Sequence, residues 1–217
     1  MTTTLHSRPV RAVLDRLFAA AARDDGRPLP PIAGSSTSAS AAQRADALQD
    51  LYLPISARGG DLLHTLVRTS RPTTVVEFGT SYGISTLYLA AALADNGAGR
   101  VFGTELNQAK VAAARASLDE AGLSDWATIL AGDALDTLAD IPAPIGLVLL
   151  DGWKDLCLPV LRLLEPRLDD AALVIADDIS LPALADYLSY VRDPANGYLS
   201  VAFPVDDGME ISCRLTR

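Results

Sequence analysis

From residue 73 onward, short runs of β-branched and other apolar residues alternate with longer segments of helical periodicity. The apolar runs predict strands at 73–78, 100–105, 126–131, 145–150 and 171–176. Strands that alternate with helices form βαβ units, which give a parallel sheet with helices on its faces. This feature therefore predicts an α/β fold for most of the chain.

The end of the chain departs from this alternation. After a helical segment at 181–191, two further strands are expected at 198–203 and 210–215, joined by a Pro- and Gly-containing turn. Two strands joined by so short a connection form an antiparallel hairpin. The complete prediction is a seven-stranded, mostly parallel sheet that a C-terminal hairpin closes at one edge.

The first 54 residues follow a different pattern. Apolar residues at helical spacing predict a short amphipathic helix near 10–18, and the Pro-, Gly- and Ser-rich residues 26–40 predict a mobile loop. Further helices are expected at 41–53 and 60–69. We therefore divide the chain into an N-terminal helical arm, 1–54, which could serve as a lid or a dimer contact, and a main domain, 55–217.

Composition limits the partners of this domain. The chain has 217 residues, 49% of them hydrophobic, and a formal net charge of −9. A charge of this sign repels nucleic-acid backbones and anionic lipid, and no apolar run approaches the ~20 residues that a membrane span needs. Two cysteines and the lack of a secretion-signal pattern predict a reducing, cytoplasmic setting.

Acidic residues gather where the predicted parallel strands end. In an open parallel sheet, ligands bind at the carboxyl ends of the strands. Carboxylates on one edge repel one another and need a cation or hydrogen-bond donors to offset them. The acidic residues concerned are Glu77, Glu105, Asp133, Asp151, Asp177 and Asp178.

The turn after the first of these strands, residues 79–83, reads Gly-Thr-Ser-Tyr-Gly and opens a helix. It fits the G-x-S-x-G elbow of α/β-hydrolases, but those enzymes need a histidine after the serine, and both histidines, His6 and His64, precede it. A nicotinamide-binding turn would need a further glycine in its middle. The third candidate is the G-x-x-x-G turn of S-adenosylmethionine-dependent methyltransferases, in which Glu105 could accept both ribose hydroxyls of the nucleoside.

A second motif favours the third candidate. Residues 151–155 read Asp-Gly-Trp-Lys-Asp, with Leu158-Pro159 beyond them, and closely resemble the D-x-W-K-D segment of catechol O-methyltransferases. Asp177-Asp178 falls where that family has Asp-Asn. From about Ile55 to its C-terminus, the chain resembles the metal-dependent small-molecule O-methyltransferases of the catechol O-methyltransferase-like family. The resemblance implies a Rossmann-like class I methyltransferase fold.

The resemblance also implies a metal site. By similarity, Asp151, Asp177 and Asp178 would hold one divalent cation, most simply Mg²⁺, which prefers oxygen ligands and leaves positions open for water or substrate. Two neighbouring hydroxyls of a catechol could fill such positions. Asp178 departs from the family's Asn and adds a negative charge beside the substrate.

Lys154 matches the family's general base, with Asp151 as the second catalytic residue. A lysine can remove a proton from a hydroxyl only if its pKa is depressed. The absence of histidine after residue 64 favours this assignment.

The resemblance implies that Trp153 packs against the adenine and that the glycine turn surrounds the methionine end of the cofactor. Gly152 replaces a histidine that the family often has, which removes one cofactor contact. The residues expected to bind S-adenosylmethionine are Ile55, Gly79, Thr80, Ser81, Tyr82, Gly83, Ser85, Glu105, Leu106, Asp133, Ala134, Asp151 and Trp153.

The expected activity is metal-assisted transfer of a methyl group from S-adenosylmethionine to a hydroxyl of a small aromatic, catechol-like or phenolic acceptor. The alternatives are a metal-independent small-molecule methyltransferase and a nucleotide-binding module without catalysis. Family habit suggests a homodimer. The sequence does not identify the acceptor.

Overall fold

The computed structural model describes residues 3–24 and 39–215. Most of the predicted mobile loop, at 26–38, lies outside the described residues. No helix in the described part of the chain has the length and apolar character that crossing a bilayer requires.

A seven-stranded sheet forms the centre of the molecule, with the order β3-β2-β1-β4-β5-β7-β6. The first five strands run parallel, β7 is antiparallel to β5, and β6 is antiparallel to β7. This confirms the predicted fold class and the C-terminal hairpin. The strands are β1 (Thr74–Phe78), β2 (Arg100–Glu105), β3 (Ala127–Ala131), β4 (Ile145–Leu150), β5 (Leu168–Ala176), β6 (Tyr198–Phe203) and β7 (Met209–Arg214).

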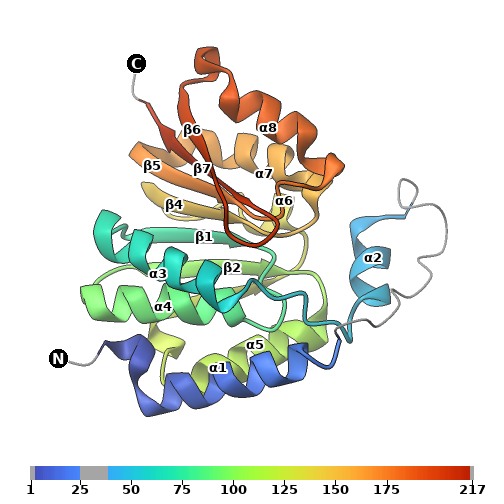
Figure 1. The fold of residues 1–217 in the computed structure, drawn as a ribbon, viewed down its shortest axis with the longest axis vertical. Coiled ribbons are helices and arrows are strands. Elements are labelled where there is room, and N and C mark those ends of the chain that lie inside the picture. Colours follow the sequence, from blue (N-terminus) through green and yellow to red (C-terminus); the bar gives the residue numbers. More distant parts are fainter. Residues whose placement is uncertain (1–2, 25–38, 216–217) are drawn as a thin grey trace.

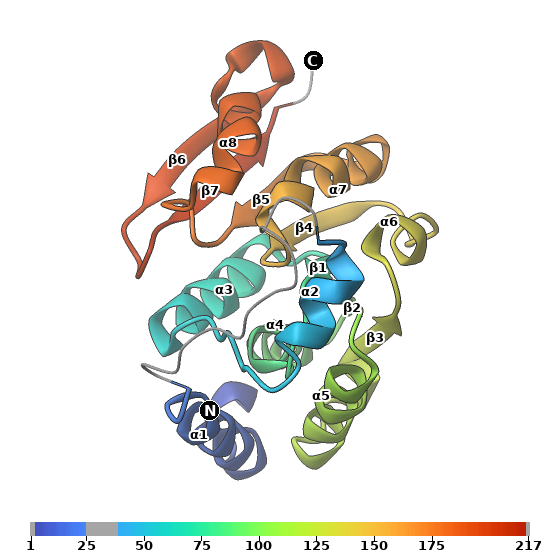
Figure 2. The same cartoon turned by 90° about the vertical axis from the view of Figure 1, so that its right-hand side faces the viewer.

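Helices cover both faces of the sheet (Figures 1 and 2). Successive residues of the buried strands point to opposite faces, so Val75 joins one hydrophobic cluster and Val76 the other. The first cluster includes residues of α1 (Arg8–Ala21), α3 (Ala57–Ser70), α4 (Ile84–Asn96) and α5 (Gln108–Glu120). The second includes residues of α6 (Ala134–Thr137), α7 (Cys157–Leu164) and α8 (Ala185–Arg192). Short 3₁₀ helices lie at Thr4–His6, Ser124–Trp126, Lys154–Leu156, Glu165–Arg167, Pro182–Leu184 and Pro194–Asn196.

The N-terminal helix α1 is part of the molecule's main core. Its apolar stripe, which includes Val10, Val13 and Leu17, is buried in the same cluster as residues of α4 and α5. By contrast, α2 (Ala41–Ala47) stands apart at the right of Figure 1. Among the described residues of the predicted arm, α1 therefore belongs to the helical layer, whereas α2 lies away from it.

The predicted helix at 41–53 is too long, because α2 ends at Ala47. A capping box of Ser40 and Gln43 fixes its start. Beyond its end, the backbone bonds to other parts of the chain: the Tyr52 N–H donates to Asp24 (3.0 Å), and the Ser81 hydroxyl donates to the Tyr52 carbonyl (2.8 Å). These partners replace the bonds that a longer helix would have made.

The largest difference from the predicted strand boundaries is at the start of β5. β5 begins at Leu168, three residues before the expected start. Its register against β4 shifts between Ile145 and Leu147, and Ala171 has a positive φ of 60°, which marks a bulge. This part of the strand was not predicted because its exposed Asp169 and Asp170 interrupt the run of apolar residues.

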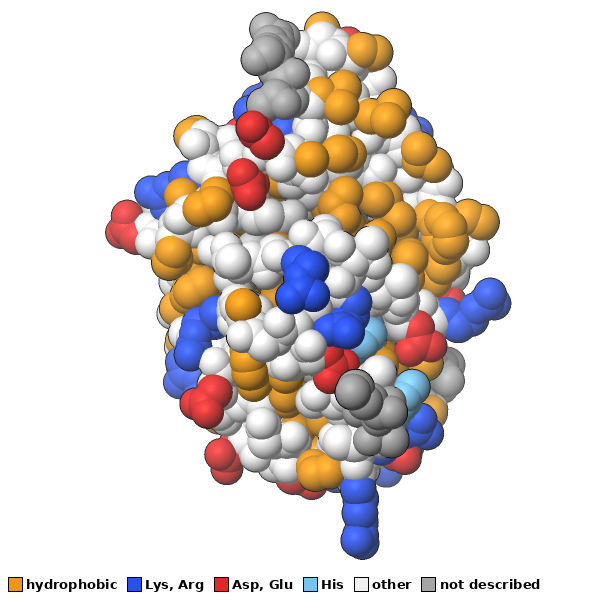
Figure 3. Space-filling model, turned by 90° about the vertical axis from the view of Figure 1, so that its left-hand side faces the viewer, with side chains coloured by type: hydrophobic (Ala, Val, Ile, Leu, Met, Phe, Trp, Pro, Cys, Tyr) orange, Lys and Arg blue, Asp and Glu red, His pale blue; other side chains and the backbone are white. Residues whose placement is uncertain are grey.

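Acidic and basic side chains are interspersed on the face shown in Figure 3. Both cysteines are free: Cys157 is buried and Cys213 half-buried.

Candidate active site

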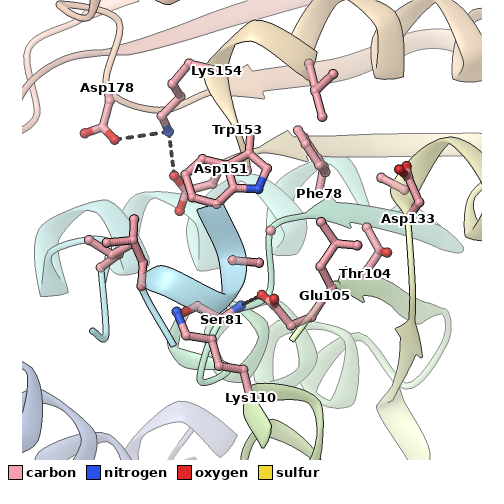
Figure 4. A pocket seen from close by; sticks show the side chains of 18 of the residues that line it. Phe78, Ser81, Thr104, Glu105, Lys110, Asp133, Asp151, Trp153, Lys154 and Asp178 are labelled. Carbon is pink, nitrogen blue, oxygen red and sulfur yellow. Dashed lines mark hydrogen bonds and ion pairs between the residues drawn. The ribbon is translucent and has the colours of Figure 1, made fainter. Parts of the chain in front are cut away.

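A cavity of about 330 Å³ lies at the carboxyl ends of the parallel strands (Figure 4). The strand order reverses at β1, which has β2 on one side and β4 on the other, and such switch points are where open α/β sheets bind ligands. The wall combines strand-end residues with part of α2. It includes Ala45, Leu48, Leu53, Phe78, Gly79, Ser81, Thr104, Glu105, Leu106, Lys110, Gly132, Asp133, Ala134, Asp151, Gly152, Trp153, Lys154, Leu156, Asp178 and Leu181.

The glycine turn after β1 approaches the loop after β4 very closely. Gly79 has a φ of +96°, and a Cβ built on it would lie 2.6 Å from the backbone nitrogen of Gly152. The N–H groups of Gly79 and Thr80 donate to the carbonyl of Thr104, at 3.3 and 3.1 Å. Glycine is therefore required at position 79, both by the backbone conformation and by the space available.

We expect Gly79→Ala to destabilise the fold by about 2–4 kcal/mol, because a left-handed backbone and a backbone clash both oppose the methyl group. Urea unfolding measures this effect. Gly97→Ala is the matched control, since Gly97 also has a positive φ but a Cβ added to it would meet nothing within 4 Å. Equal losses in the two variants would show that the close approach at Gly79 contributes nothing.

Glu105 presents a fixed carboxylate to the cavity. One of its oxygens accepts from the Ser81 N–H and the other from the Asn107 N–H, each at 2.9 Å. Each carboxylate oxygen has a second lone pair. The carboxylate is therefore oriented by the backbone and can still accept two more hydrogen bonds, the number that a pair of ribose hydroxyls donates.

Two of the residues expected to bind the cofactor, Thr80 and Ser85, form hydrogen bonds with Glu77 beneath the glycine turn. The hydroxyls of Thr80 and Ser85 donate to Glu77, at 2.8 and 2.6 Å, as does the hydroxyl of Thr86. Burial raises the pKa of Glu77 to about 7, and these three hydrogen bonds oppose the rise. Glu77, unlike Glu105, is fully buried and supports the turn from beneath.

Other predicted cofactor residues lie beside the main cavity. The ring of Tyr82 stacks on that of Tyr52, with centroids 4.0 Å apart, and its hydroxyl donates to the carbonyl of Gln49. Gly83 precedes α4 and packs on Ala114. A small pocket next to the turn is lined by Ile55, Thr80, Ser81, Tyr82 and Ser85 together with Gly79 and Asp151.

Four more of the residues predicted to bind the cofactor line the main cavity: Trp153, Leu106, Asp133 and Ala134. The sequence analysis missed Phe78, whose ring explains why residue 152 is a glycine. A Cβ on Gly152 would lie 2.5 Å from the Phe78 ring. In this chain the aromatic ring therefore fills the space that a side chain at position 152 would occupy.

Asp151, Asp177 and Asp178 converge beyond Trp153. Each offers a carboxylate oxygen within 4.8 Å of the other two. Burial, with Asp151 and Asp178 adding to it, raises the pKa of Asp177 to about 7, and burial raises that of Asp151. Asp178 adopts the left-handed conformation (φ 57°) that asparagine and aspartate tolerate best among non-glycine residues. Three clustered carboxylates whose proximity disfavours ionisation are a donor set that fits a hard divalent cation.

Lys154 lies between two of these carboxylates. Its amino group is 2.9 Å from Asp151 and 3.0 Å from Asp178 (Figure 4). These two charges raise the pKa of Lys154 against the opposing effect of burial. The expectation of a depressed pKa is therefore wrong for this arrangement, in which a protonated lysine balances the acidic cluster.

Lys110 of α5 is a further residue that the sequence analysis missed. Its side chain is buried against the glycine turn, with the amino group 3.2 Å from the Ser81 hydroxyl and 5.4 Å from the centroid of the Tyr82 ring. Burial lowers its pKa. In the sequence, Lys110 stands out only because it lies three residues after Asn107, the residue that caps the start of α5.

A second cavity, of about 580 Å³, lies on the other side of the acidic cluster. Asp178 and Leu53 line both cavities, and Asp177 lines the second. Apolar residues of α1 and of the segment after α2 form much of its wall, and carboxylates form the rest. The wall includes Phe18, Leu51, Pro54 and Ile55, together with Asp24, Asp206 and Asp207.

This arrangement of fold and site is that of a methyltransferase domain, and a family model of that description matches residues 76–179. The catechol O-methyltransferase of Sus scrofa is 30% identical over 145 residues, which are 64% of this chain and 77% of that protein. The enzyme of the same name from Mus musculus is 32% identical over 140 residues, 61% of this chain but only 52% of the longer relative. Among solved structures, the O-methyltransferase TomG of Streptomyces achromogenes, in complex with S-adenosylmethionine, shares the fold, with a TM-score of 0.66 and 24% identity over 94% of this chain and 99% of that one.

The chain belongs to the catechol O-methyltransferase-like family of S-adenosylmethionine-dependent O-methyltransferases.

Proposed function

We propose that this protein transfers the methyl group of S-adenosylmethionine to a hydroxyl of a small catechol-like acceptor, with the help of a divalent cation. The observation that carries the proposal is the position of Lys154 and the three aspartates between two cavities. One cavity has the glycine turn and Glu105, and the other is large, open and partly apolar. A donor and an acceptor could therefore meet at the acidic cluster.

The cofactor would occupy the smaller cavity. Glu105 would accept the ribose hydroxyls, Trp153, Leu106 and Ala134 would contact the adenine, and the turn at Gly79 and Ser81 would lie along the methionine end. The side chains of Thr80 and Ser85 would support the turn through Glu77, since their hydroxyls already donate to it.

Asp151, Asp177 and Asp178 would hold the cation. A bound divalent cation acts as a Lewis acid and lowers the pKa of a hydroxyl that it contacts. With Asp151 and Asp178 as its ligands, the cation would deprive Lys154 of the two partners that raise its pKa. The amine of Lys154 could then accept a proton.

In the reaction, an acceptor hydroxyl in the second cavity would lose its proton to the Nζ of Lys154, and its oxygen would attack the sulfonium methyl in line. The new O–CH₃ bond forms as the S–CH₃ bond breaks, which leaves the neutral thioether S-adenosylhomocysteine. The walls of the two cavities fix the approach of the reactants. Such positioning, with electrostatic stabilisation of the developing charges, supplies most of the rate in reactions of this kind.

The test measures methyl transfer to catechol with added Mg²⁺ and with a chelator. We expect turnover with Mg²⁺ and at least about a hundredfold loss with chelator, because Lys154 then stays paired with the carboxylates. Equal turnover under both conditions would favour the metal-independent alternative. Binding of S-adenosylmethionine without turnover of any phenol would favour a non-catalytic module. Comparing catechols that carry an amino group or a carboxylate tests the effect of the acidic wall on the choice of acceptor.

A further inference from the structure

The short helix α2 and the residues that follow it form one wall of the cofactor cavity. Ala45 and Leu48 are buried, and both line the cavity. Figure 2 shows α2 in front of the carboxyl ends of the central strands. A ligand in this cavity would therefore be covered by a segment that stands apart from the helical layers.

Arg44 is the residue that joins α2 to the loop after β4. Its two terminal nitrogens donate to the two carboxylate oxygens of Asp155, at 2.8 and 3.0 Å, in the bidentate geometry that is specific to arginine. The guanidinium also lies over the Trp153 ring, 4.6 Å from its centroid. One side chain thus contacts the residues on both sides of Lys154.

The other end of this segment is tied to the glycine turn. The Tyr82 hydroxyl donates to the carbonyl of Gln49, the Ser81 hydroxyl donates to that of Tyr52, and the two tyrosine rings stack. The contacts of Arg44, in turn, hold α2 itself against Trp153 and Asp155 on the loop after β4.

The contacts of Arg44 with Asp155 and Trp153 can be broken when α2 moves. Only 14% of the Arg44 side chain is exposed, whereas 51% of the Asp155 side chain is in contact with solvent. The buried Nε of Arg44 has no hydrogen-bond partner among the described residues. A buried donor without a partner is unfavourable, and water would satisfy it as soon as α2 moved away. The closed state is therefore held by contacts that solvent can replace.

We propose that Arg44 is a positioning residue that latches α2 over the bound cofactor and orients the turn from Trp153 to Asp155. Cofactor entry and release then require the pairing between Arg44 and Asp155 to open. This inference rests on the proposed function, because it takes the cavity as the site of S-adenosylmethionine.

The test measures the binding and dissociation of S-adenosylhomocysteine, by calorimetry and stopped-flow, in Arg44→Ala and in Asp155→Asn. Arg44→Ala is expected to speed dissociation by roughly tenfold, since a partly exposed ion pair and a cation–π contact are lost together, and Asp155→Asn, which removes only the ion pair, by about a few-fold. The double variant is expected to be no faster than Arg44→Ala alone, because both changes break one latch. Arg44→Lys should recover only part of the effect, because lysine cannot form a bidentate pair.

Asp46→Ala, on the exposed side of the same helix, is the matched control and should release the product at the wild-type rate. Wild-type dissociation in Arg44→Ala, or effects that multiply in the double variant, would overturn the latch. Thermal unfolding of the cofactor-free variants shows whether they fold. The binding measurements need no methyl transfer, so a protein that binds the cofactor but methylates no phenol would refute the proposed function, while the dissociation rates would still decide the latch.

Discussion

Lys154→Met is expected to lower kcat by about 10²–10⁴-fold, the usual contribution of a general base, while the affinity for S-adenosylmethionine stays within a few-fold of wild type. The methylene chain of methionine fills much of the same space but accepts no proton. Initial rates with catechol at saturating Mg²⁺, together with calorimetric cofactor binding, separate the two effects. A variant that loses cofactor binding as well would show that Lys154 supports the cavity rather than the chemistry.

Lys154→Arg is the matched control for charge. Arginine keeps the positive charge beside Asp151 and Asp178 but stays protonated at any accessible pH, so it cannot act as a base. We expect it to be as inactive as Lys154→Met and yet more stable without metal, because it still balances the acidic cluster. Substantial turnover by the arginine variant would mean that Lys154 acts only through its charge.

In the proposed mechanism, Lys154 also links activity to metal binding. In the structure its ammonium group occupies the space between two of the three proposed ligands, so a cation must compete with it. Removing the ammonium group leaves the carboxylates without a counter-charge. The stability of Lys154→Met should therefore depend on Mg²⁺ more strongly than that of the wild type.

The central strands could be predicted because they are buried on both faces and read as continuous apolar runs. The hydrophobic pattern predicted the wrong structure where buried residues lie outside a helix and where exposed residues lie within a strand. Leu48 and Leu51 keep helical spacing and are buried, yet they lie beyond the end of α2, where they line the two cavities. The exposed aspartates at the start of β5 hide a strand that pairs through its backbone.

The residues of the site likewise include some that the sequence predicts and some that it does not. Strand-end residues such as Glu105 and Asp151 were predictable, since the carboxyl ends of parallel strands meet at one edge. Arg44 and Asp155 are 111 residues apart, and no local pattern indicates that they pair. The sequence also does not predict Lys110 in the cavity wall, because its position there depends on how α5 packs against the glycine turn. The charge state of Lys154 depends on the distances to two aspartates, which a motif does not contain.

Asp177→Asn should have opposite effects on activity and on metal-free stability. The pKa of Asp177 is raised from 3.8 to about 7, so the folded protein binds more protons than the unfolded chain between these values. Stability from this group is present below pH ~4 and is lost as the pH rises through ~7. Asparagine does not titrate, so in chelator at pH 8 the variant should melt a few degrees higher than the wild type, and its stability should vary less with pH.

With Mg²⁺ present, the order should reverse. Under the proposed function the wild type would gain stability from the cation, since a ligand that binds only the folded state stabilises it, whereas Asp177→Asn would lack one of the three proposed ligands. We expect its Mg²⁺-dependent rise in melting temperature to disappear and its turnover to fall by at least about a hundredfold, because in the proposed mechanism the cation would free Lys154 from Asp151 and Asp178. Asp186→Asn, which removes an exposed carboxylate of α8 that lines neither cavity, is the matched control and should keep both responses. If Asp177→Asn retained its response to Mg²⁺, the cation would have to be held elsewhere, and Lys154 would need another route to its neutral form.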